Sequence, residues 1–320
     1  MSDDRPRVVV TETLAEPAER WLSERAEVVR CPLDGPAKLG DALGDAAGLV
    51  VRTYTQVDEA LLDAAPGLRV VGRGGVGLDN IDVAACARRG VRVVYTPEAN
   101  TQAVVEYVVG LMLDAHRPRT NLPARADGAT FHGLRKTEVG QQLDHFTLGI
   151  MGFGRVGQRL GRVAQALGMK LLVCDVLPEA QLRNAVEYPF AFVAANELYA
   201  GSDIVSIHVD GRASNHHLVG ADAMARLKPS CLLINSSRGF VVDAAALAAW
   251  LKAHPAARAV LDVHEPEPPG PDYPLWNVAN ARLLPHLASR TEQALANMSW
   301  VVRDVWAVLR GREPWYSVEN

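Results

Sequence analysis

Short runs of β-branched residues recur along the first hundred positions and alternate with segments of helical composition. We expect these runs to be strands, and they lie at 7–10, 48–51, 68–72 and 91–95. Strands that alternate with helices are typical of a parallel sheet with crossover helices. The pattern therefore predicts an α/β unit at the start of the chain.

A longer helical pattern follows this unit. Apolar residues recur at helical spacing from Asn100 to about His116, and Asn100 or Thr101 can cap the helix at its N-terminus. The next stretch, 117–144, is polar, has weak periodicity and is interrupted by proline and glycine. We expect it to be a connecting arm.

A second alternation of strands and helices begins at Thr147. Its six candidate strands lie at 147–152, 170–175, 203–209, 231–235, 258–262 and 282–286. A closing helix is expected from about Thr291 to Leu309. Six strands suffice for a complete doubly wound sheet. At 320 residues the chain is long enough for two such α/β domains with a cleft between them.

Composition and charge narrow the class of protein. With 48% hydrophobic and 22% charged residues, the chain is neither disordered nor fibrous. A net charge of -4 and the lack of any basic block argue against nucleic acid as the main partner. The longest apolar stretch, near Val104 to Leu113, is interrupted by Glu106 and too short for a bilayer. We therefore expect no membrane association.

The four cysteines are far apart, which suits reduced thiols rather than a disulfide framework or a zinc site. They are Cys31, Cys86, Cys174 and Cys231. The charged N-terminus carries no apolar signal region. We expect a cytoplasmic protein without a bound metal.

A glycine-rich turn, GFGRVG at 152–157, separates the strand at 147–152 from the next helical pattern. In dinucleotide-binding folds Gly152 would permit the tight turn, Gly154 the close approach of a pyrophosphate and Gly157 the packing of helix on strand. Taken alone the motif is also compatible with a flexible turn. Its position between a strand and a helix favours a dinucleotide site.

Asp175 ends the second strand of this series, 18 residues after Gly157 (175 − 157). A carboxylate there accepts hydrogen bonds from the adenine ribose hydroxyls and repels the extra phosphate of NADP. The sequence therefore favours NAD over NADP. The alternative is a solvated aspartate at a strand end.

Candidate groups for the reduction of a carbonyl follow three other strands. Arg238 comes after the strand at 231–235, where it can fork two hydrogen bonds onto a carboxylate or keto oxygen. His286 follows the last strand and can transfer a proton, especially if a carboxylate such as Glu265 or Glu267 holds its ring. Each residue also has an ordinary explanation, as a surface ion pair, a strand-end histidine or a solvated loop charge. Spacing alone does not choose between the two glutamates.

Several motifs occurring in one order make the chain similar to a known family. They are GRGGVGLDNIDV at 72–83, NTQAVVEYVVGLML at 100–113, LGIMGFGRVGQRL at 148–160, LKPSCLLINSSRGFVVDAAAL at 227–247, LDVHEPEP at 261–268 and LPHLASRTEQA at 284–294. Over essentially its whole length the chain resembles the D-isomer-specific 2-hydroxyacid dehydrogenases, closest to short members like phosphoglycerate dehydrogenase or hydroxypyruvate reductase.

The resemblance implies a fold and its division. A flavodoxin-like substrate domain would comprise 1–99 plus 288–320, and a Rossmann NAD domain would comprise 100–287. A homodimer is implied, through the nucleotide domain and the 117–144 arm.

The resemblance also implies roles for individual residues. It makes Arg238 the catalytic arginine, His286 the proton-transferring histidine and Glu267 the glutamate that orients it. Asp262 would contact the nicotinamide carboxamide. The implied cofactor contacts are Gly152, Gly154, Arg155, Val156, Gly157, Asp175, His208, Val209, Ser236, Ser237, Arg238, Asp262 and His286. The implied substrate contacts are the backbone amides of Gly75, Val76 and Gly77, with Asn100, Arg52, Arg238 and His286.

The chain departs from the family pattern in two places. Asp210, Gly211 and Arg212 replace the usual residues in a loop expected near the nicotinamide side of the cofactor. His264 stands where the family often has an aromatic or small residue. We also consider that Arg52, Arg73 or Arg212 adds a second cationic contact for a doubly anionic substrate.

The function implied is the NADH-dependent reduction of a small anionic 2-oxo acid to its D-2-hydroxy acid. Hydroxypyruvate, phosphohydroxypyruvate and phosphonopyruvate are candidate substrates. One alternative is an NAD-sensing corepressor-like binding protein of the same fold, for which the chain lacks a disordered tail or basic face. Another is an enzyme acting on formate or phosphite, whose extra active-site residues are not found.

Overall fold

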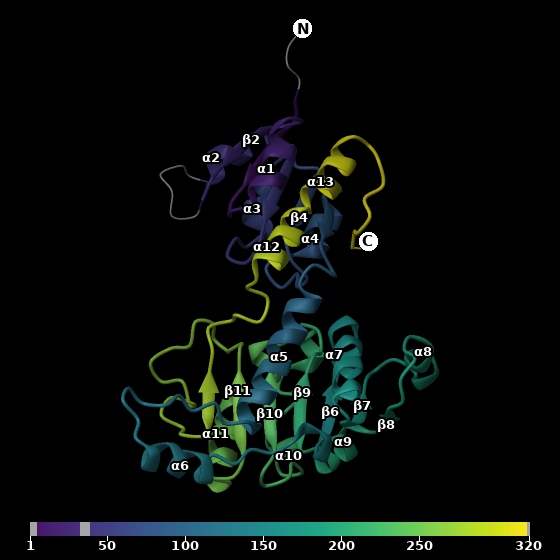
Figure 1. The fold of residues 1–320 in the computed structure, drawn as a ribbon. Helices are drawn as coiled ribbons and strands as arrows, with labels where there is room; N and C mark the ends of the chain where they lie inside the picture. Colours follow the sequence, from purple (N-terminus) through teal and green to yellow (C-terminus); the bar gives the residue numbers. More distant parts are fainter. Residues whose placement is uncertain (1–4, 33–38, 319–320) are drawn as a thin grey trace. The chain divides into compact units, whose positions relative to one another are not determined.

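The computed structural model describes residues 5–32 and 39–318, which form two compact α/β units (Figure 1). Unit 1 is Met1–Asn100 with Ser289–Asn320, and unit 2 is Thr101–Ala288. The chain thus leaves the first unit at Asn100 and returns to it after Ala288. Each unit has its own parallel sheet, as the alternating pattern predicts.

The described residues of unit 1 form a five-stranded parallel sheet in the order β2-β1-β3-β4-β5. This is the doubly wound order of flavodoxin-like folds. Its strands are β1 (Arg7–Val10), β2 (Glu27–Arg30), β3 (Gly48–Val51), β4 (Val70–Arg73) and β5 (Arg92–Tyr95). Its helices are α1 (Glu16–Ser23), α2 (Leu39–Leu43), α3 (Glu59–Asp63), α4 (Val83–Arg88), α12 (Glu292–Ser299) and α13 (Val302–Leu309).

Alternate residues of β1 enter different cores, as expected for a sheet covered on both faces. Val8 and Val10 pack with α1 and α13, whereas Val9 packs with α2, α3 and α4. The sequence pattern missed the edge strand β2, whose residues are half-buried or exposed. The closing helix expected over 291–309 is two helices, separated at Trp300 and Val301.

The described residues of unit 2 form a seven-stranded parallel sheet in the order β12-β11-β10-β9-β6-β7-β8. Its strands are β6 (Thr147–Met151), β7 (Lys170–Cys174), β8 (Ala191–Phe192), β9 (Ile204–Ile207), β10 (Leu232–Asn235), β11 (Arg258–Leu261) and β12 (Ala281–Leu283). The six predicted strands are present, and β8 is an additional edge strand too short to show in the sequence pattern. The order reverses between β6 and β9, the point where such sheets bind ligands at their carboxyl ends.

Two layers of helices cover this sheet. One core joins it to α5 (Thr101–His116), α7 (Arg155–Ala166) and α8 (Glu179–Asn184). The other joins it to α9 (Ala195–Gly201), α10 (Ala221–Met224) and α11 (Ala244–Ala253). The predicted helix after Asn100 is confirmed, and most of its apolar side chains are buried.

The arm at 117–144 contains structure that its polar sequence does not suggest. Helix α6 (Gly128–Thr137) begins after Asp127, whose carboxylate accepts a hydrogen bond from the Thr130 amide at 2.8 Å. A single turn, η1 (Leu143–His145), leads into β6. None of the residues of α6 is buried, which explains why the helix has no apolar pattern.

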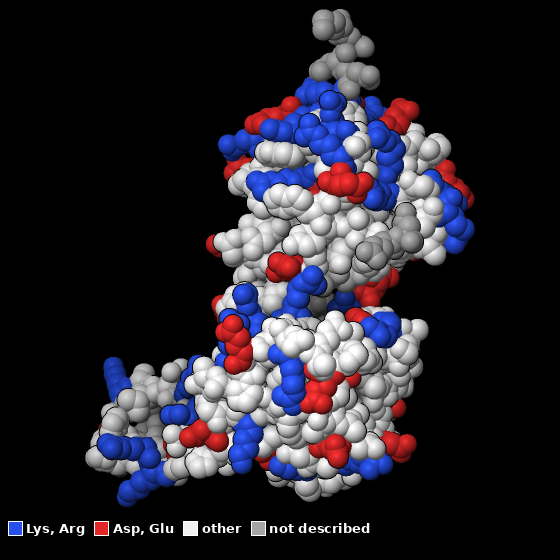
Figure 2. Space-filling view, turned by 90° about the vertical axis from the view of Figure 1, so that its right-hand side faces the viewer, with Lys and Arg blue, Asp and Glu red and all other residues white. Residues whose placement is uncertain are grey.

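The surface mixes charges of both signs. Figure 2 shows basic side chains gathered over the part of unit 1 near the N-terminus, with acidic side chains among them. Arginines of unit 1 form ion pairs, including Arg7 with Glu27 at 3.1 Å. Among the described residues, no helix is long and apolar enough to cross a membrane. All four cysteines are described, and no two of them form a disulfide.

Candidate active site

The glycine turn lies between β6 and α7, at the carboxyl edge of the unit 2 sheet. Gly152 has a φ of 90°, and a Cβ there would lie 2.7 Å from the backbone of His208. A Cβ on Gly157 would lie 2.3 Å from the carbonyl oxygen of Gly152. Gly154, by contrast, precedes the first residue of α7 and has no atom within 4 Å of its Cβ position. Two glycines are therefore required by the fold, whereas the middle one faces open space at a helix N-terminus.

Polar groups around the turn fit a dinucleotide. Asp175 accepts hydrogen bonds from the amides of Phe153 at 2.5 Å and Leu177 at 2.8 Å, which fixes its carboxylate beside the turn. The hydroxyl of Ser236 is buried and, in the described part of the chain, has no hydrogen-bond partner. A buried hydroxyl without a partner is costly unless a ligand satisfies it. A bound dinucleotide would supply such a partner.

His208, another implied cofactor contact, is a neutral group in this setting. Its Nε2 is 2.8 Å from the hydroxyl of Ser206, and burial lowers the pKa of His208 to about 4. Its backbone and that of Val209 press against Gly152. These contacts place both residues directly beside the glycine turn.

Arg238 lies in the loop after β10, next to the loop that carries the acidic residues. Its Nη1 donates to the carbonyl of Ser237 at 2.8 Å, and its own carbonyl accepts from Asn235 at 2.8 Å. The following residue must be glycine, since a Cβ on Gly239 would lie 1.8 Å from the carbonyl oxygen of His264. This close backbone approach was not visible in the sequence.

Of the two glutamates that could hold the ring of His286, Glu267 is the one that contacts it. Oε1 of Glu267 lies 2.6 Å from Nδ1 of His286, and Oε2 accepts from the amide of His264 at 3.3 Å. Burial acts to raise the pKa of Glu267, but the hydrogen bond and positive charge of His286 outweigh it, so the pKa lies below its usual value. Glu265 faces other residues, His216 and His217.

His286 is held in a strained backbone conformation with its ring half-exposed. Its φ is 54°, in the left-handed region that costs energy for a residue with a Cβ. Its Nδ1 faces Glu267, and its Nε2 forms no hydrogen bond to the described residues. Strain of this kind persists only where neighbouring contacts enforce it.

Asp262 supplies those contacts. Its two carboxylate oxygens accept from the amides of Leu287 and Ala288, each at 2.8 Å, and its side chain is almost completely buried. Burial raises the pKa of Asp262 despite these bonds. Burial, together with the negative charge of Asp262, raises the pKa of Tyr107 in α5 to about 12. The sequence alone did not indicate that Tyr107 lies near Asp262, because Tyr107 is part of an apolar helical pattern.

The predicted substrate amides lie after β4 in unit 1. Gly75 has a φ of 156°, and the space of its missing Cβ is filled by the guanidinium of Arg73. The Gly75 amide donates to the carbonyl of Arg73 at 2.8 Å. In the described part of the chain, the amides of Val76 and Gly77 donate to no protein group, which leaves both available to an anion.

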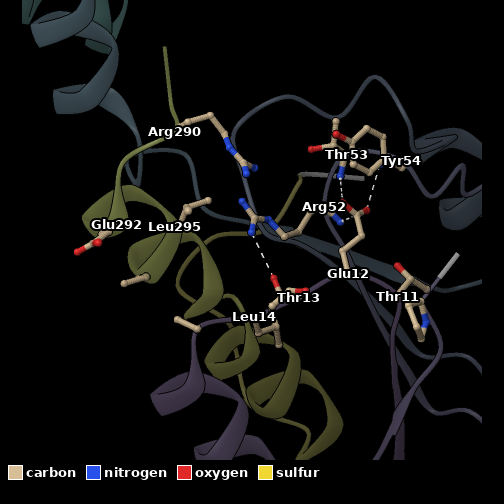
Figure 3. Close-up of a pocket in the computed structure, with 13 residues that line it drawn as sticks. Thr11, Glu12, Thr13, Leu14, Arg52, Thr53, Tyr54, Arg290, Glu292 and Leu295 are labelled. Atoms are coloured by element: carbon tan, nitrogen blue, oxygen red, sulfur yellow. Dashed lines mark hydrogen bonds between the residues drawn. The ribbon is translucent and has the colours of Figure 1, made fainter. Parts of the chain in front are cut away.

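Unit 1 also contains an open pocket of about 830 Å³ (Figure 3). Arg52 and Arg290 extend into it toward each other, and Arg52 donates to the carbonyl of Thr13 at 3.2 Å. Glu12 accepts the amides of residues 52, 53 and 54 at 2.9–3.0 Å, which fixes the loop that carries Arg52. The pocket includes neither Asn100 nor the loop at 75–77.

The electrostatics of this pocket favour an anion. Burial lowers the pKa of Arg52, the charge of Glu12 opposes that change, and the charge of Arg290 adds to it. Among the described residues, Arg290 forms no ion pair. Two guanidinium groups that repel each other in one pocket are stabilised by an anion between them. Arg290 lies within the motif LPHLASRTEQA at 284–294, but the sequence alone assigns it no role.

The unusual loop after β9 is closed by an ion pair. Arg212 donates two hydrogen bonds to Asp210, from Nε to Oδ1 at 2.7 Å and from Nη2 to Oδ2 at 2.5 Å. The side-chain amide of Asn215 also donates to Asp210. The hydrogen bond from Arg212 chiefly lowers the pKa of Asp210, and Arg238 contributes. The charge of Asp175 reaches Arg212 as well. The charges of this loop therefore interact with those of both Asp175 and Arg238.

Comparison with known proteins gives a consistent relationship. The sequence model of the D-isomer specific 2-hydroxyacid dehydrogenase NAD binding domain matches residues 109–288. A D-3-phosphoglycerate dehydrogenase of Archaeoglobus fulgidus is 36% identical over 80% of this chain and 48% of its own length. The chain thus spans about half the length of that relative.

Two further relatives match along nearly their full length. A glyoxylate reductase of Thermofilum pendens is 33% identical, covering 97% of this chain and 93% of that protein. The crystal structure of an NADPH-dependent glyoxylate/hydroxypyruvate reductase from Sinorhizobium meliloti, in complex with NADP and malonate, has a TM-score of 0.80 and 30% identity over 98% of this chain and 97% of its own. The fold, the motifs and these relatives together show that the chain belongs to the D-isomer-specific 2-hydroxyacid dehydrogenase family.

Proposed function

We propose that the protein reduces a small anionic 2-oxo acid to the D-2-hydroxy acid with a nicotinamide cofactor. The observation that carries the proposal is the contact of 2.6 Å between Glu267 and His286. A carboxylate on Nδ1 fixes the ring orientation and stabilises the protonated imidazolium, which is the form that can donate a proton from Nε2.

In this mechanism the protein residues control one proton and one carbonyl. His286 donates a proton from Nε2 to the keto oxygen, and Glu267 holds the imidazolium during that transfer. Arg238 hydrogen-bonds and polarises the same carbonyl group. In the oxidative direction neutral His286 takes the proton from the 2-hydroxyl, so the two directions require opposite protonation states of the ring.

The anionic character of the substrate is supported by unit 1. The amides of Val76 and Gly77 suit a carboxylate, and Arg52 with Arg290 suits a second anionic group. We propose that a 2-oxo acid with a second anionic group, a carboxylate, phosphate or phosphonate, is a better substrate than glyoxylate. The malonate in the Sinorhizobium meliloti complex is likewise a dianion.

NAD is the proposed cofactor because Asp175 would lie beside the adenine ribose, where it disfavours a 2′-phosphate. The charge of Asp175 adds to the raised pKa of Arg212, and we propose that the positive charge of Arg212 in turn weakens that discrimination. A comparison of kcat/KM for NADH and NADPH, in the wild type and in Arg212→Ala, tests both statements. We expect the wild type to prefer NADH and the variant to prefer it more strongly.

A homodimer through the 117–144 arm is the proposed assembly. The arm exposes apolar side chains of Leu122, Phe131 and Val139, which would be buried between two copies. Light scattering coupled to size-exclusion chromatography measures the mass in solution. A monomer at micromolar concentration would contradict the proposal.

The central test of function is the oxidation of NADH, followed by absorbance, with a panel of 2-oxo acids. Glyoxylate, hydroxypyruvate, phosphohydroxypyruvate and phosphonopyruvate cover one and two anionic groups. We expect turnover with at least one acid and a loss of at least about a hundredfold in His286→Ala with NADH affinity retained. Turnover unaffected by this substitution would exclude His286 as the proton donor.

A further inference from the structure

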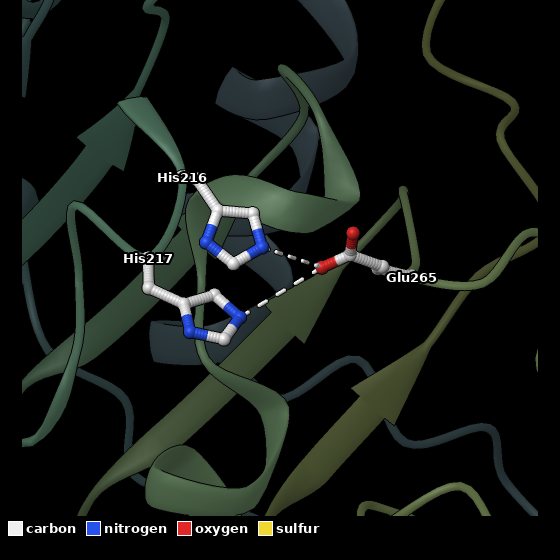
Figure 4. Close-up of side chains that lie close together, drawn as sticks. All are labelled: His216, His217 and Glu265. Atoms are coloured by element: carbon white, nitrogen blue, oxygen red, sulfur yellow. Dashed lines mark ion pairs between the residues drawn. The ribbon is translucent and has the colours of Figure 1, made fainter. Parts of the chain in front are cut away.

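A cluster of metal-binding side chains lies in unit 2, apart from the contact between Glu267 and His286. His216 and His217 follow the short turn η2 (Ala213–Asn215), and both face Glu265 in the loop after β11 (Figure 4). We propose that these three side chains bind a divalent transition-metal cation of the zinc type. The site does not depend on the proposed dehydrogenase activity.

The positions of the ligand atoms suit such a cation. Nε2 of His216 and Nε2 of His217 each lie 3.8 Å from Oε2 of Glu265, and the three ligand atoms lie within 4.8 Å of one another. A point equidistant from three such atoms is at most about 2.5 Å from each, close to the Zn–N distance of about 2.0–2.1 Å. Small side-chain rotations therefore bring all three atoms to bonding distance.

The donor types also select the class of ion. Two imidazoles and one carboxylate suit Zn²⁺, Ni²⁺ and Cu²⁺ better than Ca²⁺ or Mg²⁺, which prefer oxygen ligands alone. The side chains are 55%, 41% and 46% exposed for His216, His217 and Glu265, so water can complete the coordination sphere.

The backbone holds the two adjacent histidines on one side. His217 has a φ of 50°, a left-handed conformation that is uncommon for a residue with a Cβ, and its amide donates to the carbonyl of Phe240 at 2.8 Å. The two imidazole rings stack with centroids 4.0 Å apart, and His216 also stacks on the ring of Phe240. Consecutive side chains on an extended strand point in opposite directions, whereas here both rings reach the same carboxylate.

A second carboxylate, that of Asp243, lies near the other ring nitrogen of His217. Oδ2 of Asp243 lies 3.7 Å from Nδ1 of His217, while its Oδ1 accepts the amides of Ala245 and Ala246 at the start of α11. Histidines that bind metals through one nitrogen commonly donate from the other nitrogen to a carboxylate. The Asp243 carboxylate, fixed by the helix, lies on this side of the His217 ring at a distance longer than a hydrogen bond, so a small movement is needed for this role.

The test is a titration of the full-length, untagged protein after treatment with a chelator. Calorimetry with ZnCl₂ should show one Zn²⁺ per chain, and CoCl₂ should produce visible absorption bands of protein-bound Co²⁺. We expect Glu265→Gln and His217→Ala to weaken Zn²⁺ binding by at least about tenfold. His132→Ala, which removes an exposed histidine of α6 outside the cluster, should leave the affinity unchanged.

Circular dichroism and a thermal melt establish that each variant is folded before its titration. The proposal is overturned if the wild type shows no saturable Zn²⁺ binding. It is equally overturned if Glu265→Gln and His217→Ala bind as the wild type does, or if His132→Ala weakens binding as much as they do.

Discussion

Asp262→Asn offers a direct test of how the fold positions His286. The carboxylate accepts two backbone amides, from Leu287 and Ala288, both at 2.8 Å, within a nearly fully buried environment. Asparagine keeps one acceptor oxygen and turns an NH₂ group toward the other amide. One charged hydrogen bond is lost, at a cost of about 1.5–3 kcal/mol.

Two measurements follow from this loss. For a unit of this size, 1 kcal/mol shifts the melting temperature by about 2–4 °C, so unit 2 should melt about 3–12 °C lower. The released amides should also let the strained backbone of His286 relax away from its φ of 54°. We expect kcat to fall by about ten- to a hundredfold.

Asp304→Asn is the matched control. Asp304 is also a buried aspartate with a pKa raised by burial, and it accepts the amide of Trp315 at 2.7 Å, but in unit 1. It should lower the stability of unit 1 and leave kcat intact. A normal kcat in Asp262→Asn would refute the positioning role, and a weakened Kd for NADH at unchanged kcat would support a cofactor contact instead.

Three further predictions concern other parts of the site. Gly157→Ala should prevent stable folding, because its Cβ would lie 2.3 Å from the carbonyl oxygen of Gly152. Gly154→Ala should fold normally, because no atom lies within 4 Å of the new Cβ, but it should bind NADH more weakly in a fluorescence titration. Arg290→Ala should raise KM at least about tenfold for a 2-oxo acid with a second anionic group but not for glyoxylate; equal effects on both would contradict the pocket's role. The pKa of Glu267 in the folded protein lies below the usual value of 4.5, so its ionised form stabilises the fold above pH 4.5. This stability is lost as the pH falls from 4.5 through the pKa of the folded state. Glu267→Gln should therefore make the melting temperature less dependent on pH in the acid range, as thermal melts at several pH values can measure.

Much of the fold is readable from local sequence. The β-branched runs predicted ten of the strands, since buried parallel strands are continuously apolar and bounded by turns. They did not reveal β2 and β8, because edge strands are half-exposed or very short and carry no such run. Helix α6 was missed because it buries no side chain and thus has no apolar face to read.

The sequence by itself determined the kinds of chemistry in this protein: a glycine turn before a helix, an aspartate after the next strand, and an arginine, a histidine and two glutamates at strand ends. Only the tertiary structure decided which glutamate meets His286, because Glu265 and Glu267 are two residues apart and their directions depend on the loop. It alone brought Arg290 to Arg52 and Tyr107 to Asp262. Such pairs join segments far apart in the chain, and their contacts depend on packing that no local pattern records.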